Sequence, residues 1–202
     1  METLTFHGSG VNIRSIDRAV ELLEAGSVII YPTDTLYALG CDALNARAVG
    51  RLCDIKGLNP AKNLLSIVCD SLSMASEYAR IDNHAFRLLK ANLPGPFTSI
   101  LPTLPRLPRV FRDRHSVGIR IPDNAVARKL VETLGRPVLT TSVAIDDDDE
   151  SMEPESVAMH YEHQADAILD AGPGLCIPSA VIDITDPSAP EVIREGPADL
   201  KY

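Results

Sequence analysis

Runs of consecutive apolar residues alternate along this chain with segments whose apolar residues recur at helical spacing. The continuous runs predict buried β-strands over residues 27–31, 64–69, 97–101, 117–121 and 138–143. Between these runs, apolar residues repeat at the spacing of a helix face, as in the amphipathic segment that Ser15 opens and Gly26 ends. Strands that alternate with helices predict an α/β fold built on a largely buried sheet.

Capping residues and further apolar patterns predict the remaining elements. Asn45 can cap a helix that carries Val49 and Leu52 on its apolar face. Other helices are expected over residues 72–78, 84–90, 124–134 and 155–163, and short strands over residues 36–40, 180–184 and 192–194. Because the strands are short and some are adjacent in sequence, we expect a mixed sheet. The basic segment 102–114 is expected to be irregular.

Composition places the chain among ordinary globular proteins, with 45% hydrophobic and 23% charged residues. Its 202 residues fit one domain over positions 1–202. No apolar run reaches the roughly 18 residues that a membrane span needs. The N-terminal residues also lack the basic and apolar regions of a secretory signal. A cytoplasmic location without membrane attachment is therefore expected.

The cysteines and histidines give little support for a metal site. No two cysteines form a Cys-x-x-Cys pair, and cytosolic proteins rarely carry structural disulfides. We therefore interpret all four as small buried apolar residues, namely Cys41, Cys53, Cys69 and Cys176. His160 and His163 are three positions apart on an expected helix, but no cysteine lies near them. They are interpreted as a surface pair, and no metal ligands are predicted.

Charge is distributed unevenly along the chain, whose formal net charge is −9. Residues 1–79 carry 6 Lys and Arg against 9 Asp and Glu, residues 80–140 carry 11 against 4, and residues 141–202 carry 2 against 15. Two interpretations are open. The basic middle third can present a surface to an anionic partner, or the acidic and basic parts can face each other in the fold.

Several familiar active-site motifs are missing from the sequence. There is no Gly-x-Gly-x-x-Gly after the first expected strand, no Gly-x(4)-Gly-Lys-Ser/Thr phosphate loop and no Gly-x-Ser-x-Gly elbow. Polar groups instead follow the strand 27–31 directly, in the order Thr33, Asp34, Thr35 and Tyr37. Such groups need hydrogen-bond partners when buried, and open α/β sheets bind ligands beyond strand ends.

Other polar residues recur at the ends of expected strands and helices. They are Lys56, Arg120, Thr140, Thr141, Ser142, Ser179 and Arg194. If these residues converge, one lysine, two arginines and several hydroxyls form a pocket for a phosphorylated or carboxylated ligand, because arginine grips such groups in a bidentate fork. Taken singly, each is equally compatible with an ordinary ion pair or with strand-forming composition.

The order of these pieces is more specific than any one of them. The chain contains, in sequence, YPTDTLYALG, Lys56, LPGPFTSIL, GIRIP, TTS, PSAVIDI and IREG. This succession, over residues 12–197, resembles the YrdC/YciO family, which includes the Sua-type synthases, and the short YciO branch is the more similar one. The resemblance implies a single-domain α/β fold, with a twisted mixed sheet of parallel and antiparallel strands flanked by helices and a large basic cavity.

The resemblance also implies an activity. Members form threonylcarbamoyl-AMP from threonine, bicarbonate and ATP, and they release pyrophosphate. The product serves the threonylcarbamoyladenosine modification of tRNA. Expected ligands and partners are therefore ATP, magnesium, tRNA and tRNA-modification proteins, and binding of double-stranded RNA is a further implied property.

At matching positions, the resemblance implies two groups of site residues. Threonine contacts are implied for Thr33, Arg120 and Ser179, and nucleotide contacts for Lys56, Thr140, Ser142 and Arg194. Lys56 and Arg194 are the expected catalytic residues, because positive charge at these positions neutralises the phosphates during nucleotidyl transfer.

Two positions depart from the family pattern. The family's Lys-x-Arg reads Lys56-Gly57-Leu58, and its Ser-x-Asn ends at Ala144 instead of asparagine. Lys62 is expected to compensate for the missing arginine as a nucleotide-binding residue. Loss of one charge-assisted contact costs roughly 2 kcal/mol. We therefore expect activity to fall by about one to two orders of magnitude.

Two rival functions follow from these observations. The first alternative to the synthase is a binding module for tRNA or double-stranded RNA. The second is a nucleotide-binding module with weak or no synthase activity. Phosphate contacts in the first case are expected from the basic segment, through Arg106, Arg109, Arg112 and Arg114.

Overall fold

The computed structural model describes residues 1–6, 10–112, 115–143 and 153–201. The strands are β1 (Glu2–Thr5), β2 (Ile29–Tyr31), β3 (Ala38–Asp42), β4 (Ser66–Val68), β5 (Phe97–Pro102), β6 (Ser116–Arg120), β7 (Val138–Ser142), β8 (Ala167–Asp170), β9 (Ala180–Asp183) and β10 (Glu191–Arg194). The helices are α1 (Ile13–Glu24), α2 (Ala46–Lys56), α3 (Leu72–Tyr78), α4 (Asn83–Asn92), α5 (Arg109–Arg112), α6 (Ala125–Leu134) and α8 (Pro154–His160).

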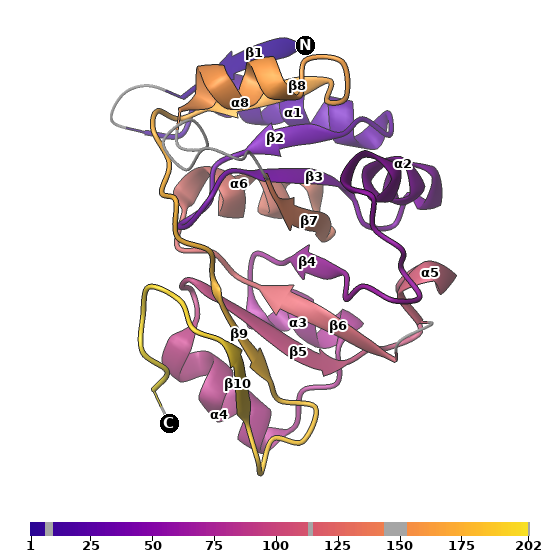
Figure 1. Ribbon diagram of the computed structural model, residues 1–202, viewed down its shortest axis with the longest axis vertical. Helices are drawn as coiled ribbons and strands as arrows, with labels where there is room; N and C mark the ends of the chain where they lie inside the picture. Colours follow the sequence, from indigo (N-terminus) through magenta and orange to yellow (C-terminus); the bar gives the residue numbers. More distant parts are fainter. Residues whose placement is uncertain (7–9, 113–114, 144–152, 202) are drawn as a thin grey trace.

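These strands form one twisted sheet in the order β1-β8-β2-β3-β7-β4-β6-β5-β9-β10. The β1–β8, β2–β8, β4–β6 and β5–β9 pairs are parallel, and the other pairs are antiparallel. Figure 1 shows α1 and α6 beside the upper half of the sheet, and α3 and α4 beside the lower half. The expected α/β fold with a mixed sheet flanked by helices is confirmed.

Caps that the sequence indicated set the helix boundaries. The Asn45 side chain accepts hydrogen bonds from the backbone of Arg47 and Ala48 at the start of α2. Asn124 caps α6 in the same way, and Gly135 ends that helix with a left-handed φ of 70°. The helix expected over 155–163 is shorter and ends at His160.

The sequence did not predict β1, β8 or α5. In β1 only Leu4 is buried, so this edge strand has no continuous apolar run. In β8 only Ala167, Ile168 and Leu169 are buried. Such a short apolar run, close to an expected helix, does not by itself predict a strand. Helix α5 is a single turn within the segment expected to be irregular.

The central strands are buried on both faces. Within β2, Ile29 and Tyr31 belong to an apolar cluster with α1 and α6, whereas Ile30 belongs to a second cluster that includes residues of α2, α3 and α4. This two-sided burial explains why β2 reads as a continuous apolar run in the sequence.

One cysteine contradicts the expectation that all four are buried. Cys41, Cys53 and Cys69 lie in the core, but Cys176 is exposed. Its neighbours Leu175 and Ile177 are also exposed, because this stretch is a surface connection between β8 and β9. The two histidines of the expected surface pair, His160 and His163, are both exposed.

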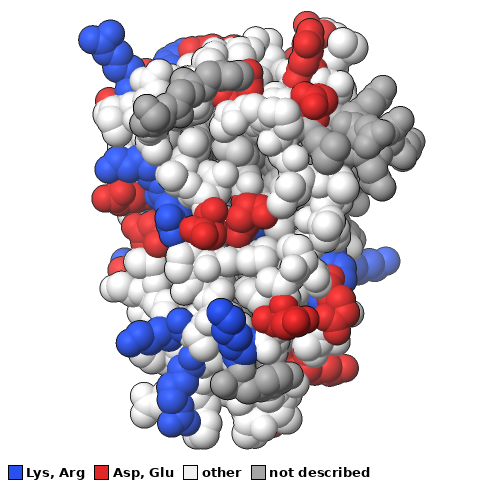
Figure 2. Space-filling view, turned by 90° about the vertical axis from the view of Figure 1, so that its left-hand side faces the viewer, with Lys and Arg blue, Asp and Glu red and all other residues white. Residues whose placement is uncertain are grey.

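Cations of the basic middle third pair with carboxylates of the first third. Arg106 bonds Glu77 at 2.7 Å, and Arg136 bonds Asp42 at 2.8 Å. On the face in Figure 2, acidic and basic side chains are interspersed. These two pairs involve the weakly acidic first third and not the strongly acidic residues 141–202, so they do not decide between the two interpretations of the charge distribution. Among the described residues, no helix is long and apolar enough to cross a membrane.

Candidate ligand-binding cavity

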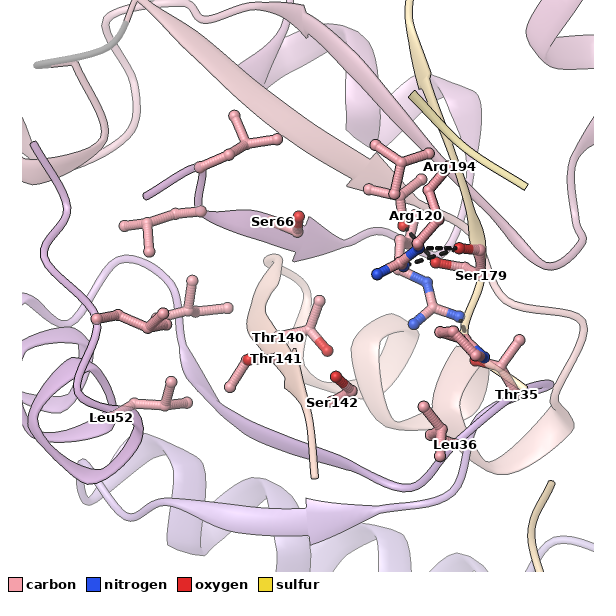
Figure 3. A pocket seen from close by; sticks show the side chains of 17 residues that line it. Thr35, Leu36, Leu52, Ser66, Arg120, Thr140, Thr141, Ser142, Ser179 and Arg194 are labelled. Atoms are coloured by element: carbon pink, nitrogen blue, oxygen red, sulfur yellow. Dashed lines mark hydrogen bonds between the residues drawn. The ribbon is translucent and has the colours of Figure 1, made fainter. Parts of the chain in front are cut away.

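A cavity of about 230 Å³ opens where strands from distant parts of the chain meet. Its lining includes Ser66 of β4, Thr98 of β5, Arg120 of β6, Thr140 of β7 and Arg194 of β10. In Figure 3, Arg120, Arg194 and Ser179 cluster at one end, the hydroxyls of β7 lie in the middle, and Leu52 lies at the opposite end. The cavity therefore has chemically different ends.

Arg120 is the most constrained charged group of the cavity, with its side chain 8% exposed. Its Nη2 donates to Asp34 Oδ1 at 3.1 Å and to Thr35 Oγ1 at 3.0 Å. Its buried Nε has no hydrogen-bond partner within the described part of the chain. Because an unsatisfied buried N–H is costly, Nε is suited to donate to an acceptor atom of a ligand.

The loops after β2 and β6 lock together around this arginine. Asp34 Oδ2 accepts a hydrogen bond from the Asp123 backbone at 2.9 Å, and Asn124 Nδ2 donates to the Thr33 carbonyl at 3.3 Å. Asp34 is thus held by Arg120 on one side and by a backbone N–H on the other. This arrangement fixes the direction in which the guanidinium of Arg120 points.

Arg194 lies beside Arg120 and reaches back to Ser179. Its Nε and Nη2 donate to the Ser179 carbonyl at 3.0 and 2.8 Å, and Ser179 Oγ lies 2.8 Å from Thr98 Oγ1. Partial burial and then the charge of Arg120 lower the pKa of Arg194. Two guanidinium groups that repel each other favour an anion placed against both.

A row of hydroxyls on β7 continues the cavity away from the arginines. Tyr31 donates from its hydroxyl to Thr140 Oγ1 at 2.6 Å. Burial raises the pKa of Tyr31 to about 12, so the phenol stays protonated at neutral pH. Because Thr140 accepts from Tyr31, its own hydroxyl hydrogen can be donated into the cavity, where Thr141 and Ser142 also lie.

The structure brings five of the eight expected site residues to this cavity. They are Arg120, Thr140, Ser142, Ser179 and Arg194. Thr33 is not in the lining: it is buried and donates to the Leu36 carbonyl, while Thr35 faces the cavity. Lys56, the last residue of α2, and the exposed Lys62 are also outside the lining. The ligand contacts of all eight remain predictions.

Sequence reasoning missed Thr98 and Ser66 as lining residues. Ser66 begins β4 between Leu65 and Ile67, and Thr98 follows Phe97 in β5, so a polar residue next to apolar ones was the available signal. The structure also places Leu58, the first departure from the family pattern, in the lining. The second departure, Ala144, lies outside the described residues.

Magnesium has no obvious protein ligand at this cavity. The lining residues that the structure describes include hydroxyls but no Asp or Glu, and the described chain has no cluster of three or more metal-binding side chains. Protein-bound Mg²⁺ is usually held by one or two carboxylates together with substrate phosphates. The donor set therefore does not fit a resident magnesium ion, and we treat Mg²⁺ only as a companion of ATP.

Comparison with known proteins assigns the family. The Sua5/YciO/YrdC family model, described as "Telomere recombination", matches residues 21–196, and the chain belongs to this family. The "Uncharacterized protein YciO" of Escherichia coli K12 is 39% identical over 198 residues, which are 96% of this chain and 95% of that protein. The crystal structure of E. coli YciO superposes with a TM-score of 0.91, covering 100% of this chain and 98% of that one.

More distant relatives carry a named activity. A threonylcarbamoyl-AMP synthase of Pyrococcus abyssi is 32% identical over 186 residues, which are 91% of this chain but only 54% of that protein. The structure of P. abyssi Sua5 complexed with L-threonine has a TM-score of 0.85 at 29% identity, covering 96% of this chain and 57% of that one. The family thus includes threonylcarbamoyl-AMP synthases, and this chain spans about half of that synthase.

Proposed function

We propose that this protein forms threonylcarbamoyl-AMP from threonine, bicarbonate and ATP, for threonylcarbamoyladenosine modification of tRNA in the cytoplasm. The observation that supports this proposal most is the unsatisfied Nε of Arg120 beside Arg194, in a chain that belongs to a family with such synthases. A carboxylate and an α-phosphate are the anionic groups that two adjacent guanidiniums suit.

The proposed reaction has two steps. The amine of threonine first forms a C–N bond with the carbon of bicarbonate and water leaves, which gives N-carboxythreonine. In the second step one bond forms and one breaks. The carbamate oxygen of N-carboxythreonine attacks the α-phosphorus of ATP, and the bond between the α- and β-phosphates breaks with its electrons leaving on pyrophosphate. No general base is needed, because the carbamate is already anionic. Arg120, Thr35 and Ser179 would hold the amino acid, and Arg194 would neutralise charge at the α-phosphate.

Lys56 is proposed to act on the departing pyrophosphate from outside the cavity lining. If Lys56 interacts with the pyrophosphate only as its negative charge develops in the transition state, Lys56 raises kcat without tightening the binding of ATP. Thr140, Ser142 and Lys62 are proposed to contact the nucleotide. Protein partners in tRNA modification belong to the same proposal.

Pyrophosphate release tests the proposed activity directly. Release from ATP is measured with and without threonine and bicarbonate, and the adenylate is identified by mass. We expect threonine-dependent release, abolished by Arg194→Ala and by Lys56→Ala. Leu44→Ala, an exposed change away from the cavity, serves as the control and should keep the wild-type rate. Wild-type turnover in either site variant would contradict that assignment.

A second candidate is a nucleotide-binding module with weak or no turnover. Leu58 in the cavity lining is the observation that favours it, because a leucine cannot neutralise phosphate charge. Nucleotide binding without threonine-dependent pyrophosphate release would select this candidate over the synthase.

The structure gives less support to an RNA-binding role for the basic segment. Arg106 is paired with Glu77 and lies 5.8 Å from the centre of the Tyr78 ring, whereas Arg109 is exposed. The side chains of Arg112 and Arg114 are outside the described structure. RNA binding therefore stays a prediction, and a steep decrease of affinity with salt would support it.

A further inference from the structure

The two ends of the cavity differ in a way that bears on which nucleotides it binds. At one end lie the guanidiniums of Arg120 and Arg194. Leu52 of α2 lies at the opposite end, and the lining also includes three further leucines: Leu58, which follows α2, Leu64 and Leu65. Leu58 follows the last turn of α2, where its backbone N–H donates to the Cys53 carbonyl at 2.8 Å. Its side chain is partly buried and packs against the core.

An apolar end of this kind disfavours multiple phosphates. A phosphoryl group placed against leucine side chains loses hydration and gains no hydrogen bond, which costs free energy. The described lining contains two positively charged residues, and both are at the far end. Two guanidiniums match one phosphomonoester, which carries about −1.5 to −2 charges at pH 7. They equally match a carboxylate together with one phosphodiester.

We infer that the cavity recognises the adenylate part of a nucleotide, as found in nucleoside monophosphates and acyl-adenylates, and gains no affinity from the β- and γ-phosphates. Leu58 is the residue that sets this specificity. The inference rests on the proposed function in one respect, since it takes the ligand to be an adenine nucleotide. It goes beyond that function, because it predicts that the protein holds its product at least as tightly as ATP.

Binding of AMP, ADP and MgATP to the intact protein tests the inference without any need for turnover. We expect the three dissociation constants, measured by calorimetry, to agree within about threefold. A site that grips the outer phosphates would instead bind ATP at least tenfold more tightly than AMP, and that result would overturn the inference. Failure of all three to bind at millimolar concentration would also overturn it.

Leu58→Arg tests whether Leu58 is the determinant. Because the new arginine adds a charge-assisted contact to the outer phosphates, MgATP should bind at least tenfold more tightly while AMP binding changes by less than threefold. Leu44→Arg adds the same charge at the opposite end of α2, where Leu44 is 38% exposed, and should change neither. Equal tightening of AMP and ATP in Leu58→Arg would contradict the role of Leu58.

The two proposals fail in different experiments. Absence of threonine-dependent pyrophosphate release would refute the synthase. It would leave intact the inference that the β- and γ-phosphates add no affinity, because that inference is measured by binding alone. If Leu58→Arg does not fold, the wild-type series from AMP to ATP still decides the matter. A Lys56→Ala variant that loses affinity for ATP but not for AMP would show that the lysine grips the outer phosphates, contrary to the inference.

Discussion

At the scale of single residues, the Asp34–Arg120 pair is the most consequential contact near the cavity. Both side chains are almost completely buried, at 9% and 8% exposure, and Asp34 also accepts from the Asp123 backbone. Burial of two charges is costly, so such a pair contributes little net stability against an apolar replacement. Its value lies in holding the Arg120 guanidinium in one orientation.

Removal of Asp34 should therefore be much more harmful than removal of a surface carboxylate. We expect Asp34→Ala to lower the free energy of unfolding by about 3 kcal/mol, because Arg120 is left buried and uncompensated. Glu132→Ala, which breaks the exposed Lys129–Glu132 pair, should cost less than about 1 kcal/mol. Urea denaturation measures both, and similar losses would contradict the account given for Asp34.

The cysteines give a second prediction at this scale. Burial raises the pKa of the Cys41 and Cys69 thiols far above the ordinary value and also raises that of Cys53. A thiolate is the reactive form, so these three should not react in the native protein. We expect one thiol, Cys176, to react with a disulfide reagent before denaturation and all four afterwards. Loss of the native reaction in Cys176→Ser confirms the site.

At the scale of elements, Asp166 joins three parts of the chain just before β8. Its carboxylate accepts from Arg51 of α2 at 2.5 Å and from the Val28 backbone at 2.8 Å, next to β2. Partial burial raises the pKa of Asp166, but the hydrogen bonds from Arg51 and Val28 outweigh it and leave the pKa lowered. The ionised form is thus the one that the fold prefers.

The lowered pKa of Asp166 makes the free energy of unfolding depend on pH in a defined direction. Because the pKa of Asp166 in the folded protein lies below the ordinary value for an aspartate, its contribution to stability is present above that ordinary value and is lost as pH falls through the folded pKa. Asp166→Asn should lower the free energy of unfolding by about 1 kcal/mol at pH 7. The difference from wild type should shrink at pH 3. The exposed Asp17→Asn serves as control, and a difference that grows in acid would contradict this.

How far the elements can be predicted depends on whether their signal is local. The asparagine caps at positions 45 and 124 depend on neighbouring residues, and the apolar run of β2 is itself a local pattern, so the sequence was enough to predict these elements. Strand β1 contains a single buried residue, Leu4, and exists because its backbone pairs with β8 across most of the chain length. No local pattern can carry that information.

At the scale of the whole molecule, the cavity exists because separate parts of the chain meet. Arg120 and Arg194 are on β6 and β10, which lie three places apart in the sheet. The sequence indicated their chemistry, since strand-end arginines and hydroxyls favour anionic ligands. It could not decide that Thr35 faces the cavity in place of Thr33, or that Lys56 lies outside the lining, because side-chain direction depends on the packed loops.

Gly118 of β6 is a second position whose role depends on how separate parts of the chain pack together. Gly118 of β6 lies between Ser66 of β4 and Thr98 of β5, both of which line the cavity. A Cβ atom at Gly118 would approach Ser66 Oγ to 2.3 Å, and Ser66 Cβ and Thr98 Cγ2 to 3.0 Å. Glycine is thus required by space, because three strands bring their side chains to one point.

Gly118→Ala should therefore lower the free energy of unfolding by about 1–3 kcal/mol, through overpacking between rigid strands. In a double-mutant cycle, Ser66→Gly should offset at least about 0.5 kcal/mol of that loss, because it removes two of the three close contacts. Gly50→Ala in α2 is the matched control: a Cβ there meets nothing within 4 Å, so stability should rise by about 0.5–1 kcal/mol. An additive cycle would show that a side chain at position 118 does not press against Ser66. If the two substitutions are energetically coupled and Gly118→Ala also weakens AMP binding, then the packing of these strands affects the ligand site.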